Sequence, residues 1–471
     1  MEDILNSVLR ECKLTFDQSF NVPLERKEIY GEVKTDFKLI RDMFSLIPKH
    51  LFKNPGIRWC DPCCGSGEFM IFLYKVLDKT IEIEDVEKRR RHIKKTMLWM
   101  VEINECHIPI LKSIFGEEAN IIHGSYLDIN NLDVDIIVGN PPFNINGRIK
   151  VPTNKYRVCK KTDGISIWGR FVIHSLFTML KKSRYGYLLF ITPSIWMKKD
   201  YKLNKLMLNH SIYKIRTMNS SETNIIFHGN AQTPTSYFLM SKRKRHKHPR
   251  HPPIKIYDNI TNKYIPYNYI SNEGLISSLP LCGISILNKI HKYNFCRRLS
   301  VYKSNMRPGY KNLSISNTKD DEHPYPNITT CLLKKNQPIL KINYSNIKCE
   351  WEGIPKIVFA HKMYGFPYFD REGKFGISNR DNYIIHDYLP HHLERICDFF
   401  YTKLGLYVLE MTRYRMRYLE KYIFNMIPDV IAKLEVITDD SVNNLFELSE
   451  LERKYINTFH SKHYLKTILV N

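Results

Sequence analysis

A glycine-rich turn at residues 61–69 holds the first group of side chains that could do chemistry. It reads D-P-C-C-G-S-G-E-F and stands between a short apolar run and an apolar helical pattern. Gly65 and Gly67 can adopt positive φ and let a ligand approach the backbone closely. Asp61, at the end of the expected strand, could accept a hydrogen bond from a cationic group of that ligand. The turn lacks the lysine and the spacing of a phosphate-binding P-loop, which argues against hydrolysis of a nucleoside triphosphate.

An acidic residue follows the next expected strand along the chain. Glu102 stands in V-E-I-N, at the end of an apolar run. An acid in this position of a nucleotide-binding sheet typically accepts hydrogen bonds from two ribose hydroxyls. We therefore interpret Glu102 as a ribose ligand, and an ordinary exposed glutamate is the alternative.

The most specific pattern is G-N-P-P-F at residues 139–143, after a further apolar run. Two consecutive prolines are stiff and donate no hydrogen bonds, so they hold the carbonyl of Pro141 outward at the end of a strand. Together with the side-chain oxygen of Asn140, this carbonyl makes two acceptors aimed at one amino group. Phe143 then offers an aromatic face on which a planar base can stack.

These motifs, in this order, resemble those of S-adenosylmethionine-dependent amino-methyltransferases, specifically the type that methylates N6 of adenine in DNA. The segment G-E-V-K-T-D-F-K-L-I-R-D-M at residues 31–43 looks like the cofactor motif that precedes the glycine turn in the gamma class. In that class the target-recognition domain is C-terminal. The resemblance covers residues 28–241 motif by motif, and beyond them it is architectural only.

The resemblance implies a role for each matched residue and no metal site. The cofactor is S-adenosylmethionine, and its methionine part is expected near Val33, Thr35, Asp61, Cys63 and Gly65. Glu102 matches the ribose ligand. The catalytic motif is Asn140, Pro141, Pro142 and Phe143. The substrate is adenine in double-stranded DNA, flipped out of the helix to reach the motif.

Two further positions match less closely. In H-G-S-Y-L the family usually has an acid and an aromatic after the glycine, and here these positions are Ser125 and Tyr126. Serine can still hydrogen-bond the ligand but brings no negative charge, and Asp128 is the alternative acid. Phe227, in N-I-I-F-H-G-N, looks like the aromatic that packs against the flipped base; a core phenylalanine is the other interpretation.

The elements that must position these residues follow from apolar periodicity. Helical spacing predicts helices at 34–47, 69–77, 82–95 and 167–180. Apolar runs predict strands at 56–60, 97–103, 120–126, 134–138, 186–192, 212–218 and 236–240. This alternation predicts an α/β domain over residues 1–258, with a mostly parallel sheet covered by helices on both faces. The resemblance implies that this sheet is the Rossmann-like sheet of a methyltransferase catalytic domain.

From residue 259 the alternation disappears. Tyr, Asn, Ser and Pro become frequent, and we expect residues 259–471 to form a C-terminal α+β domain. The resemblance implies that this domain recognises the DNA target. Residues 393–422 have helical spacing, with a basic and aromatic face comprising Arg413, Tyr414, Arg415, Arg417 and Tyr418. A solvated helix is the alternative interpretation of that face.

Charge supports a polyanionic partner. The chain has 471 residues with 71 Lys+Arg and 48 Asp+Glu, a formal charge of +23, and such an excess favours nucleic acid. The basic run at 241–255 holds seven Lys/Arg and no acid. No apolar run reaches the ~18 residues that a membrane helix needs, and the first residues lack a signal-peptide pattern. We therefore expect an intracellular protein without membrane contact, cytoplasmic, or nuclear if the basic run is a localisation signal.

Cysteine usage agrees with an intracellular protein. Eleven cysteines are scattered along the chain, and an odd number outside the secretory route indicates free thiols. Cys60 and Cys63 form one C-x-x-C, but no second pair lies at zinc spacing, so we expect no zinc site.

Several alternatives stay open. The same motif resembles methyltransferases of RNA bases and of protein glutamine, and cytosine N4 is another acceptor. A non-enzymatic alternative is a DNA-binding protein on a decayed methyltransferase fold. Asp429 with Glu452-Arg453-Lys454 fits a loose nuclease pattern that occurs by chance in most chains of this length. A separate cognate restriction endonuclease is a candidate partner, and no oligomeric state follows from the sequence.

Overall fold

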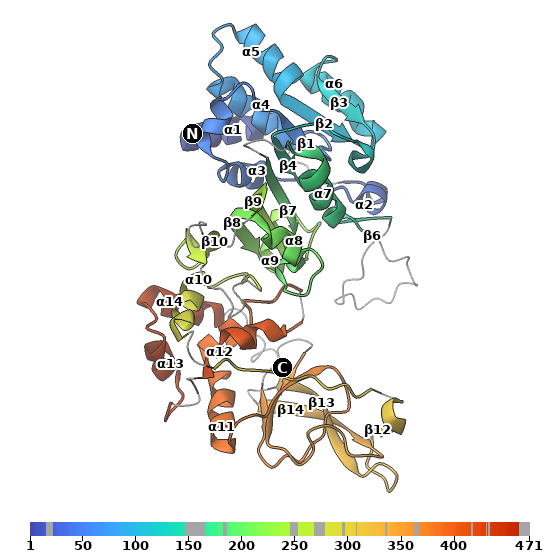
Figure 1. The fold of residues 1–471 in the computed structure, drawn as a ribbon, viewed down its shortest axis with the longest axis vertical. Helices are drawn as coiled ribbons and strands as arrows, with labels where there is room; N and C mark the ends of the chain where they lie inside the picture. The colour runs from blue at the N-terminus through green and yellow to red at the C-terminus, as the bar shows by residue number, and fades with distance from the viewer. Residues whose placement is uncertain are drawn as a thin grey trace. The chain divides into compact units, whose positions relative to one another are not determined.

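The computed structural model divides the chain into two compact units (Figure 1). Unit 1 comprises Met1–Trp196 and Asp200–Ile256, and unit 2 comprises Met197–Lys199 and Tyr257–Asn471. The structure describes residues 1–15, 22–146, 165–181, 186–244, 253–267, 278–293, 297–307, 309–334, 337–361, 367–415, 418–429, 431 and 434–460. Most of the predicted basic run, 245–252, lies outside the described residues, as does Arg417.

Unit 1 is built on one large, mostly parallel sheet. Its strands are β1 (Trp59–Asp61), β2 (Leu98–Glu102), β3 (Asn120–His123), β4 (Ile136–Gly139), β7 (Tyr187–Pro193), β8 (His210–Met218), β9 (Thr235–Lys244) and β10 (Ile254–Asp258). The spatial order of these strands is β10-β8-β9-β7-β4-β1-β2-β3. Strand β9 runs antiparallel to both of its neighbours, and the pairs from β7 to β3 are parallel. The predicted α/β sheet is confirmed.

The connecting helices cover both faces of this sheet. Helices α4 (Glu68–Thr80), α5 (Val86–His92) and α6 (Ile108–Phe115) lie in the crossovers β1–β2 and β2–β3, and α7 (Trp168–His174) lies between β4 and β7. The first two crossovers move along the sheet in one direction and the third in the other. Because parallel crossovers are right-handed, α4 and α6 lie on one face and α7 on the opposite face. The predicted covering on two faces is confirmed.

The N-terminal helices extend the first of these layers. Unit 1 begins with α1 (Glu2–Thr15), α2 (Leu24–Tyr30) and α3 (Phe37–Phe44), and its remaining short elements are β5 (Asn144–Ile145), β6 (Ile165–Ser166), α8 (Asn204–Leu208) and α9 (Ser220–Ile226). Phe44 of α3 stacks on Phe72 of α4 with ring centroids 5.7 Å apart. Both rings are at most 1% exposed. This packing fixes the segment before α3 against the sheet, and that segment carries part of the site described below.

Unit 2 combines two small antiparallel sheets with helices. One sheet has the order β12-β14-β13 and the other β16-β15-β17. The strands are β12 (Ile315–Ser316), β13 (Tyr325–Lys334), β14 (Gln337–Ser345), β15 (Lys356–Ala360), β16 (Tyr368–Asp370) and β17 (Asn382–Ile385); the helices are α10 (Ile284–Ile290), α11 (Pro390–Phe399), α12 (Lys403–Val408), α13 (Asp439–Leu445) and α14 (Glu450–His460). The predicted α+β composition is confirmed.

The continuous helix expected at 393–422 is wrong. Helix α11 ends at Phe399, α12 ends at Val408, and the described residues from 409 to 415 form no helix. Tyr414 is fully buried, and its hydroxyl donates to the carbonyl of Leu279 at 2.7 Å. The guanidinium of Arg413, 13% exposed, lies 2.6 Å from the carboxylate of Glu410. Tyr414 and Arg413 therefore turn inward, whereas the guanidinium of Arg415, 40% exposed, pairs with the carboxylate of Glu420 at 2.6 Å.

The nuclease pattern also has a structural explanation at one of its positions. Glu452 is 2% exposed and accepts hydrogen bonds from the amide and hydroxyl of Ser449 at the start of α14. The ammonium group of Lys289 lies 2.5 Å from the same carboxylate. Glu452 therefore caps a helix and pairs with a lysine inside unit 2.

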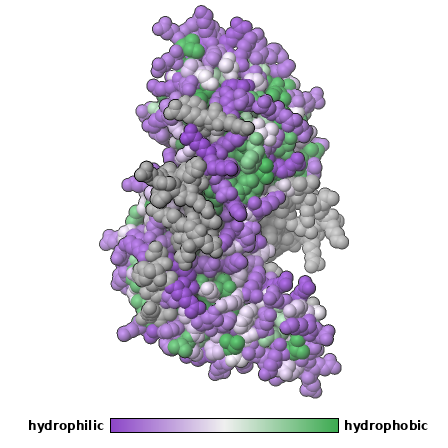
Figure 2. Space-filling model, viewed as in Figure 1, coloured by the Kyte–Doolittle hydropathy of each residue, from purple (hydrophilic) through white to green (hydrophobic). Residues whose placement is uncertain are grey.

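The visible surface, the helices and the cysteines of the described residues have the properties that the composition led us to expect. The coloured surface visible in Figure 2 is mostly hydrophilic, with scattered apolar residues. Among the described residues, no helix is both long and apolar enough to cross a membrane. The cysteines in the described part of the chain are free thiols, as predicted.

Candidate functional site

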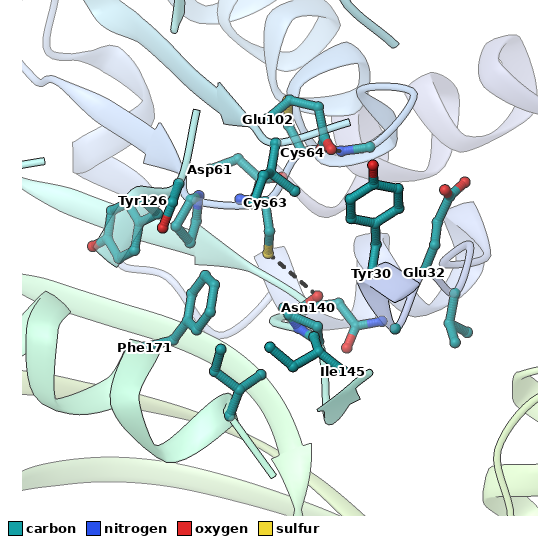
Figure 3. A pocket seen from close by; sticks show the side chains of 18 of the residues that line it. Tyr30, Glu32, Asp61, Cys63, Cys64, Glu102, Tyr126, Asn140, Ile145 and Phe171 are labelled. Atoms are coloured by element: carbon teal, nitrogen blue, oxygen red, sulfur yellow. Dashed lines mark hydrogen bonds between the residues drawn. The ribbon is translucent and has the colours of Figure 1, made fainter. Parts of the chain in front are cut away.

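A cavity of about 310 Å³ opens in unit 1 at the carboxyl ends of its parallel strands (Figure 3). Its wall comes from the turn after β1, the residues after β2, β3 and β4, and the segment between α2 and α3. The carboxyl ends of neighbouring parallel strands meet at one edge of a sheet, which is where such folds bind ligands. Most of the residues predicted from the motifs line this cavity: Val33, Thr35, Asp61, Cys63, Gly65, Glu102, Ser125, Tyr126, Asn140 and Pro142.

Two glycines allow the tight approach of the strands and the turn. Gly67 has φ of +94°, and a Cβ there would lie 2.9 Å from the side chain of Leu111 on α6. Gly139, with φ of +156°, would bring a Cβ to 2.8 Å from the carboxylate of Asp61. A larger residue at either position would therefore push apart the elements that form the cavity.

Asp61 lies at the inner wall of the cavity. Its side chain is 1% exposed, and one carboxylate oxygen accepts from the amide of Cys63 at 3.1 Å. Burial raises the pKa of Asp61 well above its usual range. A cationic ligand group beside this carboxyl would favour its ionised form, so the position suits an ammonium or a sulfonium.

Glu102 is held by backbone amides at both of its oxygens. Oε2 accepts from the amide of Gly65 at 2.7 Å and Oε1 from that of Asn104 at 2.7 Å. Each carboxylate oxygen keeps further lone-pair capacity, so the oriented group can also accept from two ligand hydroxyls. Burial raises the pKa of Glu102.

Sequence reasoning missed Glu32 and Glu68, which also line the cavity. The carboxylate of Glu32 lies 3.1 Å from Nε2 of His107, a side chain that is 3% exposed. Although burial opposes both charged forms, the pairing lowers the pKa of Glu32 and raises that of His107. Glu32 was visible in the motif that begins at Gly31, but spacing alone did not indicate which side chains point inward. Four carboxyl groups thus line one cavity, which suits a cationic ligand.

Asn140 is held at both its side chain and its backbone. The side-chain nitrogen Nδ2 donates to Oγ1 of Thr35 at 3.1 Å. The backbone carbonyl accepts from the thiol of Cys63 at 3.4 Å, the contact drawn in Figure 3. Burial raises the pKa of Cys63 well above its usual range, so this thiol keeps the proton that it donates. With Nδ2 engaged, the amide oxygen is the atom of Asn140 that remains for a substrate donor.

The aromatic part of the wall is tightly packed. Tyr126, 2% exposed, stacks on Phe171 with centroids 5.5 Å apart, and its hydroxyl lies 2.9 Å from that of Ser175. The ring therefore forms a fixed surface of the cavity. Ser125 precedes it on the same wall, and Asp128, the alternative acid, is not among the lining residues.

Three of the predicted residues lie outside the cavity wall. Pro141 is buried and Phe143 is half-buried, next to lining residues on the same segment. Phe227, at the end of α9, is 1% exposed. A ring buried to this extent offers no face to a base in this conformation, and the side chain packs as a core residue.

Comparison with known proteins finds a family model that matches the central part of unit 1. Residues 49–224 match the family model described as Eco57I restriction-modification methylase. The type II methyltransferase M.VspI of Vibrio sp. (strain 343) is 23% identical over 158 residues, which make up 30% of this chain and 34% of that protein. The chain therefore spans about a third of the length of the curated relative that it matches.

Solved structures are similar at low sequence identity. A type I restriction-modification system methyltransferase subunit from Streptococcus thermophilus is 14% identical, with a TM-score of 0.33 over 51% of this chain and 48% of that one. The type IIL restriction-modification enzyme MmeI, solved in complex with DNA, is 12% identical, with a TM-score of 0.44 over 99% of this chain and 77% of that one.

Proposed function

We propose that this chain, whose residues 49–224 match the Eco57I restriction-modification methylase family model, uses S-adenosylmethionine to methylate N6 of adenine in double-stranded DNA. The observation that carries the proposal is the position of Asn140. Its amide stands at the wall of a cavity lined by four carboxyl groups, with its nitrogen bound to Thr35 and its oxygen left as an acceptor. One cavity thus combines a site for a cationic methyl donor with an acceptor for the amine that receives the methyl group.

The cavity residues fit the methyl donor by charge and by hydrogen bonding. S-adenosylmethionine, when bound, supplies an electrophilic methyl group on a sulfonium. Asp61 and Glu102 have the chemistry to hold its ammonium group and its ribose hydroxyls, respectively. Burial raises the pKa of Asp61, and a cationic group of the cofactor beside this carboxyl would favour its ionised form.

The motif residues act by positioning the target amine. The oxygen of Asn140, on the cavity wall, accepts one hydrogen of this amine. We assign the second hydrogen to the carbonyl of Pro141, next to that wall, which leaves the nitrogen lone pair directed at the methyl group. The bound cofactor would supply the methyl group from its sulfonium to this oriented nitrogen, and the proton that the amine loses would go to solvent. Catalysis of this kind rests on orientation and exclusion of water, so no general base is required.

DNA is the substrate class that the rest of the chain favours. An amine that is paired inside a duplex reaches such a cavity only when its base is flipped out. The formal charge of +23 suits phosphate contacts. We assign catalysis to residues 1–258 and target recognition to the α+β residues 259–471, and a cognate restriction endonuclease acting on the same sites is a candidate partner.

Nucleoside analysis tests this proposal. Purified protein is incubated with genomic DNA and cofactor carrying an isotopically labelled methyl group, and the digested nucleosides are separated by mass spectrometry. We expect label in N6-methyladenine with the wild type and none with Asn140→Ala. Label in N4-methylcytosine would change the target base, and label only in added RNA or protein would overturn the assignment to DNA.

A further inference from the structure

The hydrogen bond between Asn140 and Thr35 connects the substrate side of the cavity with its cofactor side. Thr35 is 5% exposed, lines the cavity and lies on the segment between α2 and α3. Its Oγ1 accepts from Nδ2 of Asn140 at 3.1 Å. The residue thus belongs to the cofactor wall while it contacts the side chain assigned to the target amine.

A hydroxyl group has one proton and two lone pairs, so its role toward Asn140 depends on where its own proton goes. When that proton is donated elsewhere, Oγ1 acts only as an acceptor and Asn140 must turn its NH2 group toward Thr35. When the proton is donated to the amide oxygen instead, Asn140 turns its NH2 group outward. In the second arrangement the NH2 group of Asn140 faces the target amine, so two donors meet. The amide oxygen of Asn140 is then no longer available to accept from that amine.

The backbone of Asn140 has less freedom than its side-chain amide. Its carbonyl accepts from the neutral thiol of Cys63 at 3.4 Å, and the next residue, Pro141, is buried and stiff. The freedom that remains is a half-turn of the side-chain amide of Asn140, which exchanges the positions of its oxygen and its nitrogen. Thr35 is the hydrogen-bond partner of that amide on the cavity wall, so its hydroxyl decides between the two orientations.

We propose that Thr35 is a positioning residue, whose hydroxyl couples occupation of the cofactor cavity to the orientation of the Asn140 amide. The methionine part of the cofactor ends in a carboxylate, an acceptor of the kind that this hydroxyl requires. Donation to that carboxylate leaves Oγ1 as an acceptor only and turns the amide oxygen toward the target amine. The proposal rests on the proposed function and extends it by a preference in binding order: the bound cofactor prepares the site for the base.

The test compares Thr35→Val, which keeps the shape and removes the hydroxyl, with Thr35→Ser, which keeps the hydroxyl. At saturating cofactor we expect Thr35→Val to lower kcat by about 10- to 100-fold, the scale of a misplaced reacting group. We expect Thr35→Ser to restore most of it. The matched control is Thr80→Val, because the hydroxyl of Thr80 bonds to the carbonyls of Phe52 and Val76 away from the cavity; this variant should lose stability and keep kcat.

A second measurement needs no methyl transfer. In protein labelled with ¹⁵N-asparagine, the side-chain amide signal of Asn140 is identified by its loss in Asn140→Ala and followed while S-adenosylhomocysteine is added. We expect a shift in the wild type and in Thr35→Ser, and a much smaller shift in Thr35→Val at saturation. The same spectra report whether each variant is folded, and Thr35→Ala replaces Thr35→Val if the latter is not.

The outcomes separate the two proposals. A Thr35→Val enzyme with a raised KM for cofactor, unchanged kcat and a wild-type amide shift would make Thr35 a cofactor ligand only and overturn the inference. A wild type that transfers no methyl group would defeat the proposed function, while the amide signal would still test the coupling.

Discussion

Glu102 accepts a hydrogen bond from the amide of Gly65 at 2.7 Å, so the end of β2 holds the glycine turn that follows β1. The same turn is tied to β2 by a backbone bond from Cys64 to Val101 at 3.1 Å. Gly65 has φ of +54°, which directs its amide at the carboxylate and is readily adopted by glycine. The two motifs found separately in the sequence therefore form one structure.

Replacement of Glu102 should weaken cofactor binding. Hydrogen bonds to a charged group contribute about 1.5–3 kcal/mol, so Glu102→Ala should raise the Kd for S-adenosylhomocysteine by about 10- to 100-fold. Glu102→Gln, which keeps one acceptor oxygen, should have a smaller effect. Calorimetric titration measures both, with the exposed neighbour Glu105→Ala as control. An unchanged Kd in Glu102→Ala would remove Glu102 from the site.

Cofactor affinity should depend on pH through Asp61. Burial raises the pKa of this carboxyl in the ligand-free protein, and a cationic ligand favours the ionised form. Binding should therefore release protons, and affinity should fall as pH drops through the raised pKa and level off above it. Calorimetry in buffers of different ionisation enthalpy measures the released protons. In Asp61→Asn the affinity should be weaker and this pH dependence smaller; proton release equal to that of the wild type would show that another group carries it.

Arg413 should contribute to stability and not to DNA affinity. Its side chain is 13% exposed and pairs with Glu410 at 2.6 Å, so it is not available to a phosphate. Wild-type affinity should fall log-linearly with salt, by about one unit of slope per phosphate-contacting cation. Arg413→Gln should keep that slope on target and random duplexes and lower the melting temperature. A slope smaller by about one unit would place Arg413 on the DNA.

The ion pair of Lys356 and Asp370 should be important for the stability of unit 2. The two side chains are 0% and 3% exposed and 2.6 Å apart, and burial lowers the pKa of Lys356. Asp370 also accepts from the amides of Lys374 and Phe375. Lys356→Met leaves this carboxylate buried without its cation, which costs about 3–5 kcal/mol.

Urea denaturation measures this cost. The surface pair of Arg371 and Glu394, with side chains 57% and 43% exposed, provides the control: Arg371→Met should cost less than about 1 kcal/mol. Similar losses in the two variants would contradict the assigned importance of the buried pair.

The sequence predicted unit 1 well because its signals are local. The parallel strands β1, β2, β4 and β7 are short apolar runs that end at an acid, a glycine or a proline, and the carboxyl ends of parallel strands meet. Asp61, Glu102 and Asn140 therefore had to lie near one another once the order of elements was known. The charged helix predicted at 82–95 begins later in the structure, because α5 starts at Val86.

Other features depend on contacts between distant residues, which periodicity does not encode. The inward turn of Tyr414 requires the carbonyl of Leu279, 135 residues earlier in the chain. The pattern at 393–422 therefore indicated one continuous helix, whereas the structure has helices α11 and α12 and no helix at 409–415. The bond from Asn140 to Thr35 joins residues 105 positions apart. Motif spacing put both residues at the site, but only the structure gives their direct contact.

In the proposed reaction, Asn140 presents its amide oxygen to a target amine beside a bound methyl donor. The most direct test measures single-turnover transfer of labelled methyl from S-adenosylmethionine to DNA by the wild type and Asn140→Ala, together with the Kd of each for S-adenosylhomocysteine. We expect Asn140→Ala to lose methyl transfer and to bind S-adenosylhomocysteine within a few-fold of the wild type. Transfer by Asn140→Ala at a rate close to that of the wild type would contradict it.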